Sequence, residues 1–176
     1  MTETTVPNHF WRCAVPTVIV IVTLGGLSGY LSNSGYSNDW FAALDKPGFM
    51  PPGWMFGAVW TTLYALMGLA LTLVWLSPES PRRTAALWLF LVQLIVNFAW
   101  SPIFFGGRLI EIGLITILIL LALVALTAWR FARIRPLAGW LLVPYLAWLC
   151  LATALNFEIG RLNPGADAMP LGLFGG

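Results

Sequence analysis

Five long apolar runs, separated by polar or proline-rich joints, set the pattern of this chain. Each run holds roughly the 20 apolar residues that a helix needs to cross a bilayer. The runs cover about Ala14 to Leu31, Trp54 to Leu76, Ala85 to Phe105, Leu109 to Trp129 and Leu137 to Ile159. The pattern predicts an all-α fold, an integral membrane bundle of five transmembrane helices. This single domain is expected to take up residues 1–176, with an N-terminal segment (1–13) and a flexible tail (163–176) rich in glycine and proline.

The joint between the first two runs is long and carries aromatic, charged and proline residues. It spans Ser32 to Gly53, and loops longer than about 12–15 residues usually have a function or are disordered. Pro47, Pro51 and Pro52 fix φ and lack a backbone N–H, so the part from Lys46 to Gly53 is not expected to be helical. A stiff loop that leads into an aromatic helix is suited to cap a pocket for a flat, apolar ligand. The alternative is an interfacial turn that tryptophans anchor at the headgroups.

Composition and charge narrow the class of protein. The chain is 59% hydrophobic and 9% charged, whereas a soluble domain carries roughly a quarter charged residues. The lipid bilayer is therefore its expected surrounding. A formal net charge of +2 without a basic run gives no indication of nucleic-acid binding. Most arginines fall on the N-terminal side of the five spans, which by the positive-inside rule predicts a cytoplasmic N-terminus in an inner membrane.

Neutral polar residues recur at helical spacing within the spans, on the same faces as tryptophans and tyrosines. They form three groups, which are Gln93, Asn97 and Ser101 with Trp100, then Trp148, Ala152 and Asn156, and finally Trp60 with Tyr64. These faces suit an apolar ligand that carries a few polar groups. The alternative is hydrogen bonding between helices, worth about 1 kcal/mol for each bond. We favour the structural interpretation for Gln93 and the pocket for Asn97 and Trp148.

Several kinds of catalytic site are not indicated. The segment Gly26 to Gly29 has the GxSG spelling of rhomboid-type intramembrane proteases, but that chemistry needs a histidine base beside the serine. The one histidine, His9, precedes the first span, so no second helix supplies the base. The sequence has no P-loop, dinucleotide fingerprint or Cys/His cluster. Glu111 and Glu158 lie near span ends and fit interfacial charges, so binding is favoured over catalysis.

Three stretches, in this order and spacing, resemble one family. They are KPGFMPPGWMFGAVWTTLY (Lys46 to Tyr64), QLIVNFAWSPIFFGGR (Gln93 to Arg108) and PYLAWLCLATALNFEIGRLN (Pro144 to Asn163). Together with the five spans they resemble the translocator protein family, whose members are also called tryptophan-rich sensory proteins or peripheral-type benzodiazepine receptors. The resemblance covers nearly the whole chain. It implies a five-helix bundle, often a homodimer, with a ligand pocket that the first loop caps.

The resemblance also implies the ligands and the pocket. Typical ligands of the family are porphyrins such as protoporphyrin IX and haem, and synthetic isoquinoline carboxamides or benzodiazepines, with no further cofactor required. Carried over by motif position, the ligand-binding residues would be Trp40, Phe41, Trp54, Phe56, Gly57, Trp60, Asn97, Trp100, Trp148, Ala152 and Leu155. In some bacterial members the tryptophans matching Trp60 and Trp148 are linked to light-dependent porphyrin breakdown. The sequence thus leaves three functions open, which are a porphyrin receptor or carrier, an enzyme that degrades porphyrin under light through Trp60 and Trp148, and a membrane scaffold.

Two positions depart from the animal pattern of the family. Phe157 stands where the animal sterol motif has a tyrosine, although Arg161 is retained, which argues against strong cholesterol binding. Ile112 stands where animal members have a pocket tryptophan, so affinity for synthetic ligands need not carry over. The departure at Phe157 favours a bacterial membrane, and the sequence does not decide between an inner and an outer one.

Overall fold

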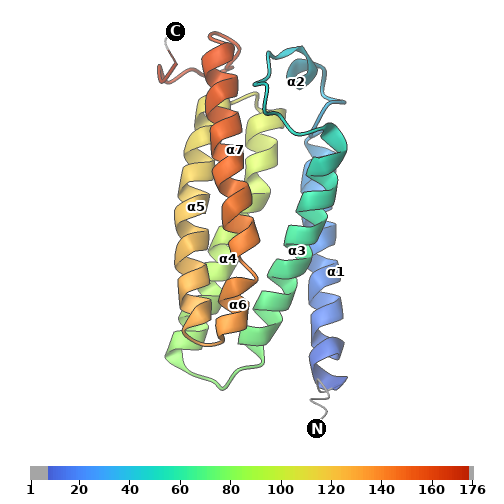
Figure 1. Ribbon diagram of the computed structural model, residues 1–176, viewed down its shortest axis with the longest axis vertical. Coiled ribbons are helices and arrows are strands. Elements are labelled where there is room, and N and C mark those ends of the chain that lie inside the picture. The colour runs from blue at the N-terminus through green and yellow to red at the C-terminus, as the bar shows by residue number, and fades with distance from the viewer. Residues whose placement is uncertain (1–7, 175–176) are drawn as a thin grey trace.

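The computed structural model describes residues 8–174 and has five helices long and apolar enough to cross a membrane. Figure 1 shows these helices side by side as one elongated bundle. The helical elements, in chain order, are α1 (Asn8–Leu31), α2 (Asp39–Ala43), α3 (Gly53–Trp75), α4 (Pro81–Ser101), the π-helical turn η1 (Pro102–Gly106), α5 (Ile110–Ala132), α6 (Pro136–Trp140) and α7 (Val143–Leu162). Residues 8–174 contain no strand. The predicted all-α membrane fold is therefore confirmed.

The helix boundaries differ from the prediction where capping and proline residues act. The first helix begins at Asn8 rather than near Ala14. The third membrane-spanning helix, α4, begins at Pro81. Its N-cap is Ser80, whose hydroxyl accepts a hydrogen bond from the backbone N–H of Arg83. The fifth predicted span is two helices, α6 and α7. Pro144 lacks the N–H that would bond the carbonyl of Trp140, so the helix is interrupted between them.

The two ends of the bundle differ in charge. The start of α1, the α3–α4 turn and the α5–α6 turn lie at one end, here called the α6 end, and α2 lies at the other, the α2 end (Figure 1). Among residues 8–174, the α6 end carries Glu79 and six arginines, namely Arg12, Arg82, Arg83, Arg130, Arg133 and Arg135. The α2 end carries three basic residues and five acidic ones, which are Lys46, Arg108, Arg161, Asp39, Asp45, Glu111, Glu158 and Asp167. A cytoplasmic α6 end stays a prediction from this asymmetry.

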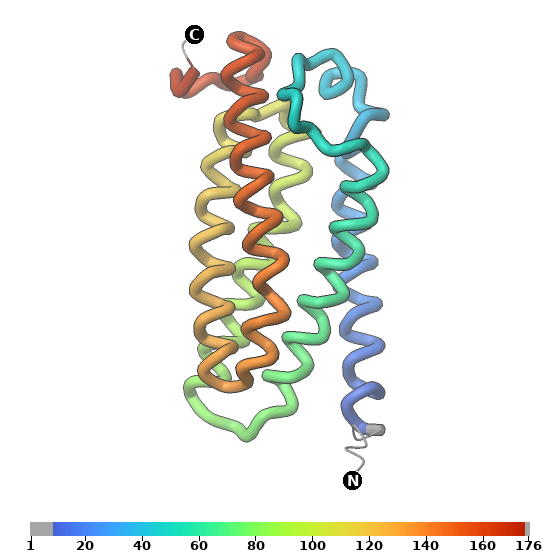
Figure 2. Tube along the Cα trace, in the orientation of Figure 1, coloured from blue at the N-terminus to red at the C-terminus, as the bar shows by residue number. Residues whose placement is uncertain are grey.

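Helix α1 packs mainly against α3, as the two neighbouring tubes in Figure 2 illustrate. Gly25 of α1 allows this close packing, because a Cβ there would overlap the ring of Tyr64 on α3. Further along, a Cβ at Gly68 of α3 would meet Val18 of α1. Gly25 therefore serves the packing of α1 against α3 within one chain.

A hydrogen bond from α1 compensates for the proline that follows α4. Pro102 has no N–H to donate to the carbonyl of Phe98, four residues earlier. The hydroxyl of Ser28 on α1 donates to that carbonyl at 2.6 Å. The chain then forms the π-helical turn η1, whose residues Phe104 and Phe105 are turned into the bundle and are buried. Ser28 therefore has a structural partner, and His9 lies 19 helical positions away, about 28 Å along α1.

Large apolar side chains cover the outside of the bundle. Ile19, Trp88, Ile95, Leu118 and Ile119 are between 48% and 63% exposed. In water such a surface would be an aggregation liability. In a bilayer it is the expected lipid-facing surface, and the chain is accordingly an integral membrane protein.

Candidate functional site

A cavity of about 620 Å³ occupies the half of the bundle nearest α2. This volume lies within the range of roughly 300–1,000 Å³ that small-molecule sites usually have. Its walls come from the α2-side halves of α1, α3, α4 and α7, from η1, and from the loop between α1 and α3, with Ile117 and Leu120 of α5 at the back. Among the described residues that line the cavity, none carries a charged side chain. The site is therefore suited to an uncharged, apolar surface.

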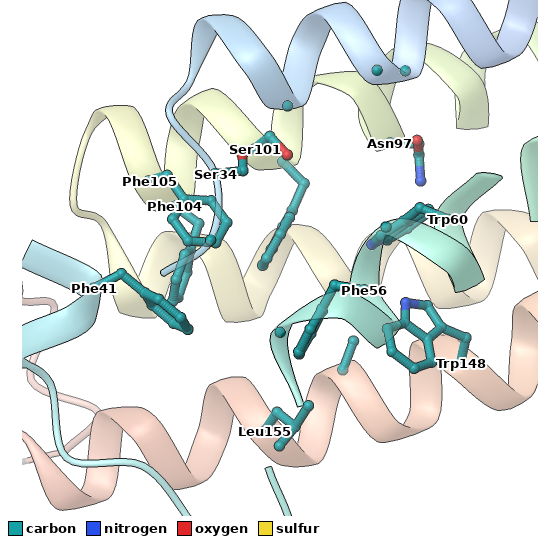
Figure 3. Close-up of a pocket in the computed structure, with 18 of the residues that line it drawn as sticks. Ser34, Phe41, Phe56, Trp60, Asn97, Ser101, Phe104, Phe105, Trp148 and Leu155 are labelled. Carbon is teal, nitrogen blue, oxygen red and sulfur yellow. The ribbon is translucent and has the colours of Figure 1, made fainter. Parts of the chain in front are cut away.

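Figure 3 shows the aromatic side chains that form the inner end of the cavity. The rings of Trp60 on α3 and Trp148 on α7 meet edge to face, with centroids 6.4 Å apart. Phe56, one turn before Trp60, contacts Trp148 in the same manner at 5.6 Å. Trp60 also stacks on Tyr64 at 5.3 Å. These rings offer both faces and edges to a planar ligand, which is the geometry that aromatic systems prefer.

A second aromatic group forms the roof of the cavity below α2. Phe41 of α2 packs edge to face on Phe105 of η1 at 5.1 Å. Trp100 of α4 stacks on Phe104 at 5.0 Å. The loop is held on η1 by Asn38, which caps α2 through its side-chain oxygen and donates its amide to the carbonyl of Phe105. The prediction that this loop is ordered and lies over a pocket agrees with this arrangement.

A buried polar chain braces the inner end of the cavity. The hydroxyl of Tyr64 donates to Oδ1 of Asn97 at 3.0 Å, and Nδ2 of Asn97 donates to the hydroxyl of Tyr145 at 2.6 Å. The chain links α3, α4 and α7, and all three residues are at most 9% exposed. Asn97 thus lines the cavity but already uses both ends of its amide. Its evident role is to fix the two tyrosines and, through them, the ring of Trp60.

Three other lining residues each have a buried polar atom without a hydrogen-bond partner among the described residues. These atoms are Oγ of Ser34, Nε1 of Trp100 and Oδ1 of Asn156. The amide nitrogen of Asn156 is paired, because it donates to the carbonyl of Ile110 at 2.9 Å. An unpaired buried polar atom costs about 1–3 kcal/mol. Each of these atoms therefore leaves a hydrogen bond unmade at the cavity wall.

Lys46 stabilises the outer part of the loop. Its Nζ lies 4.9 Å from the ring centroid of Phe41 and 5.4 Å from that of Tyr36, and it donates to the carbonyls of Ala42 and Leu44. Burial lowers the pKa of Lys46, and the neighbouring carboxylate of Asp45 partly offsets this shift. The cation therefore covers the aromatic roof from outside, as a cation–π contact.

The structure brings nine of the eleven predicted ligand-binding residues to the cavity wall. They are Phe41, Phe56, Gly57, Trp60, Asn97, Trp100, Trp148, Ala152 and Leu155. Trp54 and Trp40 are not among the residues that line it. Trp54, in the first turn of α3, is 73% exposed. Trp40 packs on Phe104 at 5.5 Å but donates Nε1–H to the carbonyl of Ala166, outside the cavity.

Some lining residues were not among the predicted ones. Phe104 and Phe105 reach the cavity through η1, and Pro102 was the visible sign of a helix irregularity there. Ser34 and the neighbouring loop residues give the cavity a polar edge, for which a periodic pattern offers no signal. Gln93, which we interpreted as a residue that hydrogen-bonds between helices, is 1% exposed. Neither end of its amide has a hydrogen-bond partner among the described residues.

The fold and the cavity together define a class, an integral membrane protein of five spans with an uncharged aromatic cavity inside the bundle. The TspO/MBR family model matches residues 17–162, and the chain belongs to this family. It is 40% identical to the translocator protein of Homo sapiens over 145 residues, 81% of this chain and 86% of that protein. It is also 40% identical to the tryptophan-rich sensory protein of Cereibacter sphaeroides over 126 residues, covering 72% and 78% of the two chains. Protein CrtK of Rhodobacter capsulatus is 35% identical over 153 residues, 86% of this chain and 94% of that protein.

Proposed function

We propose that this protein is a membrane receptor or carrier that binds porphyrins, such as protoporphyrin IX and haem, in the cavity and so regulates tetrapyrrole levels or a stress response. The observation that supports this proposal is the cavity itself, which has about 620 Å³ of space, aromatic walls and no charged lining residue among those described. A flat, apolar macrocycle fits such walls by stacking and edge contacts. Synthetic isoquinoline carboxamides or benzodiazepines would use the same surface.

The uncharged lining also favours one orientation for a bound porphyrin. A carboxylate is too costly to bury without a partner. The acid groups would therefore lie at the polar edge formed by loop residues 33–37, where Asn33, Ser34 and Ser37 line the cavity. The macrocycle would then reach toward Trp60 and Trp148. In this orientation the hydroxyl of Ser34 can donate to a ligand carboxylate.

The test is a titration of the purified protein in detergent with protoporphyrin IX in the dark, followed through quenching of tryptophan fluorescence. Wild type should show saturable binding, and Trp60→Phe and Trp148→Phe should each weaken it by about 2- to 10-fold, since an indole face or edge is lost. Trp88→Phe is the matched control, because Trp88 is 63% exposed on the lipid side and does not line the cavity. If no saturable dark binding appears, the scaffold function is favoured instead.

A second candidate function is light-dependent degradation of the bound porphyrin. The edge contact of Trp60 and Trp148, both on the cavity wall, favours it. A photoexcited porphyrin would take one electron from the adjacent indole, leaving an indole radical cation and a porphyrin radical anion. Dioxygen would be the oxidant that adds to the macrocycle as it is cleaved, and the electron would return from the porphyrin–dioxygen adduct to the indole. Illumination after the dark titration separates the candidates. Bleaching that requires protein, dioxygen and both tryptophans would support the enzyme, whereas protein-independent bleaching would leave the receptor or carrier.

We also propose a bacterial membrane as the location and a homodimer as the assembled form. Phe157 in place of the animal tyrosine supports the first. For the second, Gly25 is occupied by its contact with Tyr64 within the chain, so a dimer would use another lipid-facing surface. Cross-linking in native membranes tests the assembly.

A further inference from the structure

The loop over the cavity is fastened from outside by the segment that follows α7. Asn163 contacts the backbone of Asp45 twice, since its Oδ1 accepts from the Asp45 N–H at 2.8 Å and its Nδ2 donates to the Asp45 carbonyl at 2.9 Å. The indole Nε1 of Trp40 donates to the carbonyl of Ala166 at 3.2 Å. Neither Asp45 nor Trp40 lines the cavity. These contacts therefore hold the loop without taking part in the proposed ligand site.

The fastening segment, residues 163–174, is itself anchored on the end of α5. The carboxylate of Glu111, only 3% exposed, accepts hydrogen bonds from the backbone N–H groups of Leu171 and Leu173. The carboxylate of Asp167 accepts from the N–H of Glu111 at 2.7 Å. The ring of Phe174 packs on Phe157 and lies over Gly160, where a Cβ would overlap it. The tail thus has a fixed base on α5 and α7, although the sequence predicted it to be flexible.

The loop has little regular structure of its own to keep it closed. Between α2 and α3, residues 44–52 form neither helix nor strand. Pro47, Pro51 and Pro52 lack an N–H, so this part can make few backbone bonds. The two bonds from Asn163 occur at its beginning, next to Leu44, which is buried beside Phe41 and the roof of the cavity. Loss of the two hydrogen bonds between Asn163 and Asp45 would therefore loosen the loop beside Leu44 and Phe41, which belong to the roof of the cavity.

We propose that residues 163–174 are a clasp that keeps the α1–α3 loop closed over the cavity and thereby sets how fast a ligand enters and leaves, with Asn163 as its positioning residue. The part that concerns ligand exchange rests on the proposed porphyrin binding, whereas the fastening of the loop does not. The two bonds between Asn163 and Asp45 are exposed, and the bond from Trp40 to Ala166 is partly buried. Loss of one such bond should therefore raise the frequency of loop opening by about 2- to 10-fold.

The first measurement is backbone hydrogen exchange of the full-length, ligand-free protein in detergent. In Asn163→Ala, amides of residues 33–50 should exchange about 5- to 50-fold faster than in wild type, because two bonds are lost, while amides of α4 and α5 keep their rates. Asn163 also donates to the carbonyl of Ile159 at the end of α7. Trp40→Phe is therefore the second variant, since it removes the indole N–H and retains a smaller aromatic ring that can pack on Phe104. It should give about a 2- to 10-fold increase.

The second measurement is stopped-flow binding and release of protoporphyrin IX. Both association and dissociation rates should rise in Asn163→Ala and Trp40→Phe by similar factors, with Kd changed by less than about 2-fold and an unchanged thermal midpoint. A merely structural defect would instead lower the midpoint and weaken binding. Glu158→Gln is the matched control. It breaks the exposed ion pair with Arg161 at the same end of α7 and does not touch the loop.

Unchanged hydrogen-exchange rates of the loop amides in both variants would overturn the proposed clasp. Faster loop exchange with unchanged ligand rates would overturn its role in ligand access, because the ligand would then enter by another route. If wild type fails to bind porphyrin, the proposed function fails, and the hydrogen-exchange result alone still decides whether residues 163–174 fasten the loop.

Discussion

The two halves of this bundle contain similar apolar residues, but one half is close-packed and the other contains a cavity. The half near α6 is filled. Phe90 of α4 stacks on Phe131 of α5 at 5.6 Å, and Met67, Val74 and Ala86 around them have no exposed surface. The half near α2 encloses the cavity of about 620 Å³. The difference lies in how side chains meet across helices rather than in hydrophobicity.

Glycine illustrates this difference. In the filled half, Gly139 of α6 allows close backbone approach, because a Cβ there would collide with Ala132 and the carbonyl of Ala128 on α5. In the open half, a Cβ at Gly26 or Gly57 would meet no atom within 4 Å, and both glycines line the cavity. Glycine therefore allows close contact at Gly139, and at Gly25 on the cavity wall, but leaves open space at Gly26 and Gly57.

The rigid parts of the open half explain why it does not collapse into its cavity. Close packing is the usual state of an interior, and apolar voids are normally few and small. Here the Tyr64–Asn97–Tyr145 hydrogen bonds hold three helices at a fixed spacing, and η1 directs two phenylalanines inward without closing the gap. The cavity is kept open by polar bonds and a helix irregularity.

The largest expected effect is a loss of stability in the filled half. Phe90→Ala should lower the free energy of unfolding by about 3–5 kcal/mol, because it creates a cavity in a close-packed region. Phe56→Ala should cost clearly less, since Phe56 already borders empty space. Unfolding in mixed detergent micelles measures both. A larger loss in Phe56→Ala than in Phe90→Ala would contradict the distinction between the halves.

A smaller effect is expected from two adjacent glycines of α1 in the open half. Gly25→Ala should cost about 1–3 kcal/mol as overpacking, because its Cβ would displace the Tyr64 ring and disturb the bond to Asn97. Gly26→Ala is the matched control and should be within about 0.5 kcal/mol of wild type. The same unfolding assay compares them. Equal losses in the two variants would mean that Tyr64 can move freely.

Much of the fold could be predicted from the sequence because membrane spans depend on local composition. Five apolar runs of the required length specify five helices wherever their neighbours lie. Helix ends were less accurate, since they depend on caps such as Ser80 and on Pro144, whose effect is a break within the fifth span. The residues carried over from the family motifs mostly reached the cavity wall, because helical spacing sets which of them share a face.

The rest of the site depends on contacts between distant segments. Trp40 faces the tail rather than the cavity because the carbonyl of Ala166 accepts its N–H, 126 positions away. Glu111 was interpreted as an interfacial charge, whereas its carboxylate is buried and holds backbone groups of the tail. No periodic pattern encodes such pairings.

The smallest expected effect tests how the helix irregularity at the open half is supported. Ser28→Ala removes the donor to the Phe98 carbonyl and should cost about 0.6–2 kcal/mol. Thr62→Ala is the matched control, because the hydroxyl of Thr62 bonds only a carbonyl of its own helix and is exposed. In Pro102→Ala a backbone N–H becomes available to the same carbonyl, so Ser28→Ala should cost less in that background than in wild type. A double-mutant cycle of unfolding free energies measures this coupling. Strict additivity would mean that Ser28 does not substitute for the missing donor, and that another contact keeps η1 in the shape that lines the cavity.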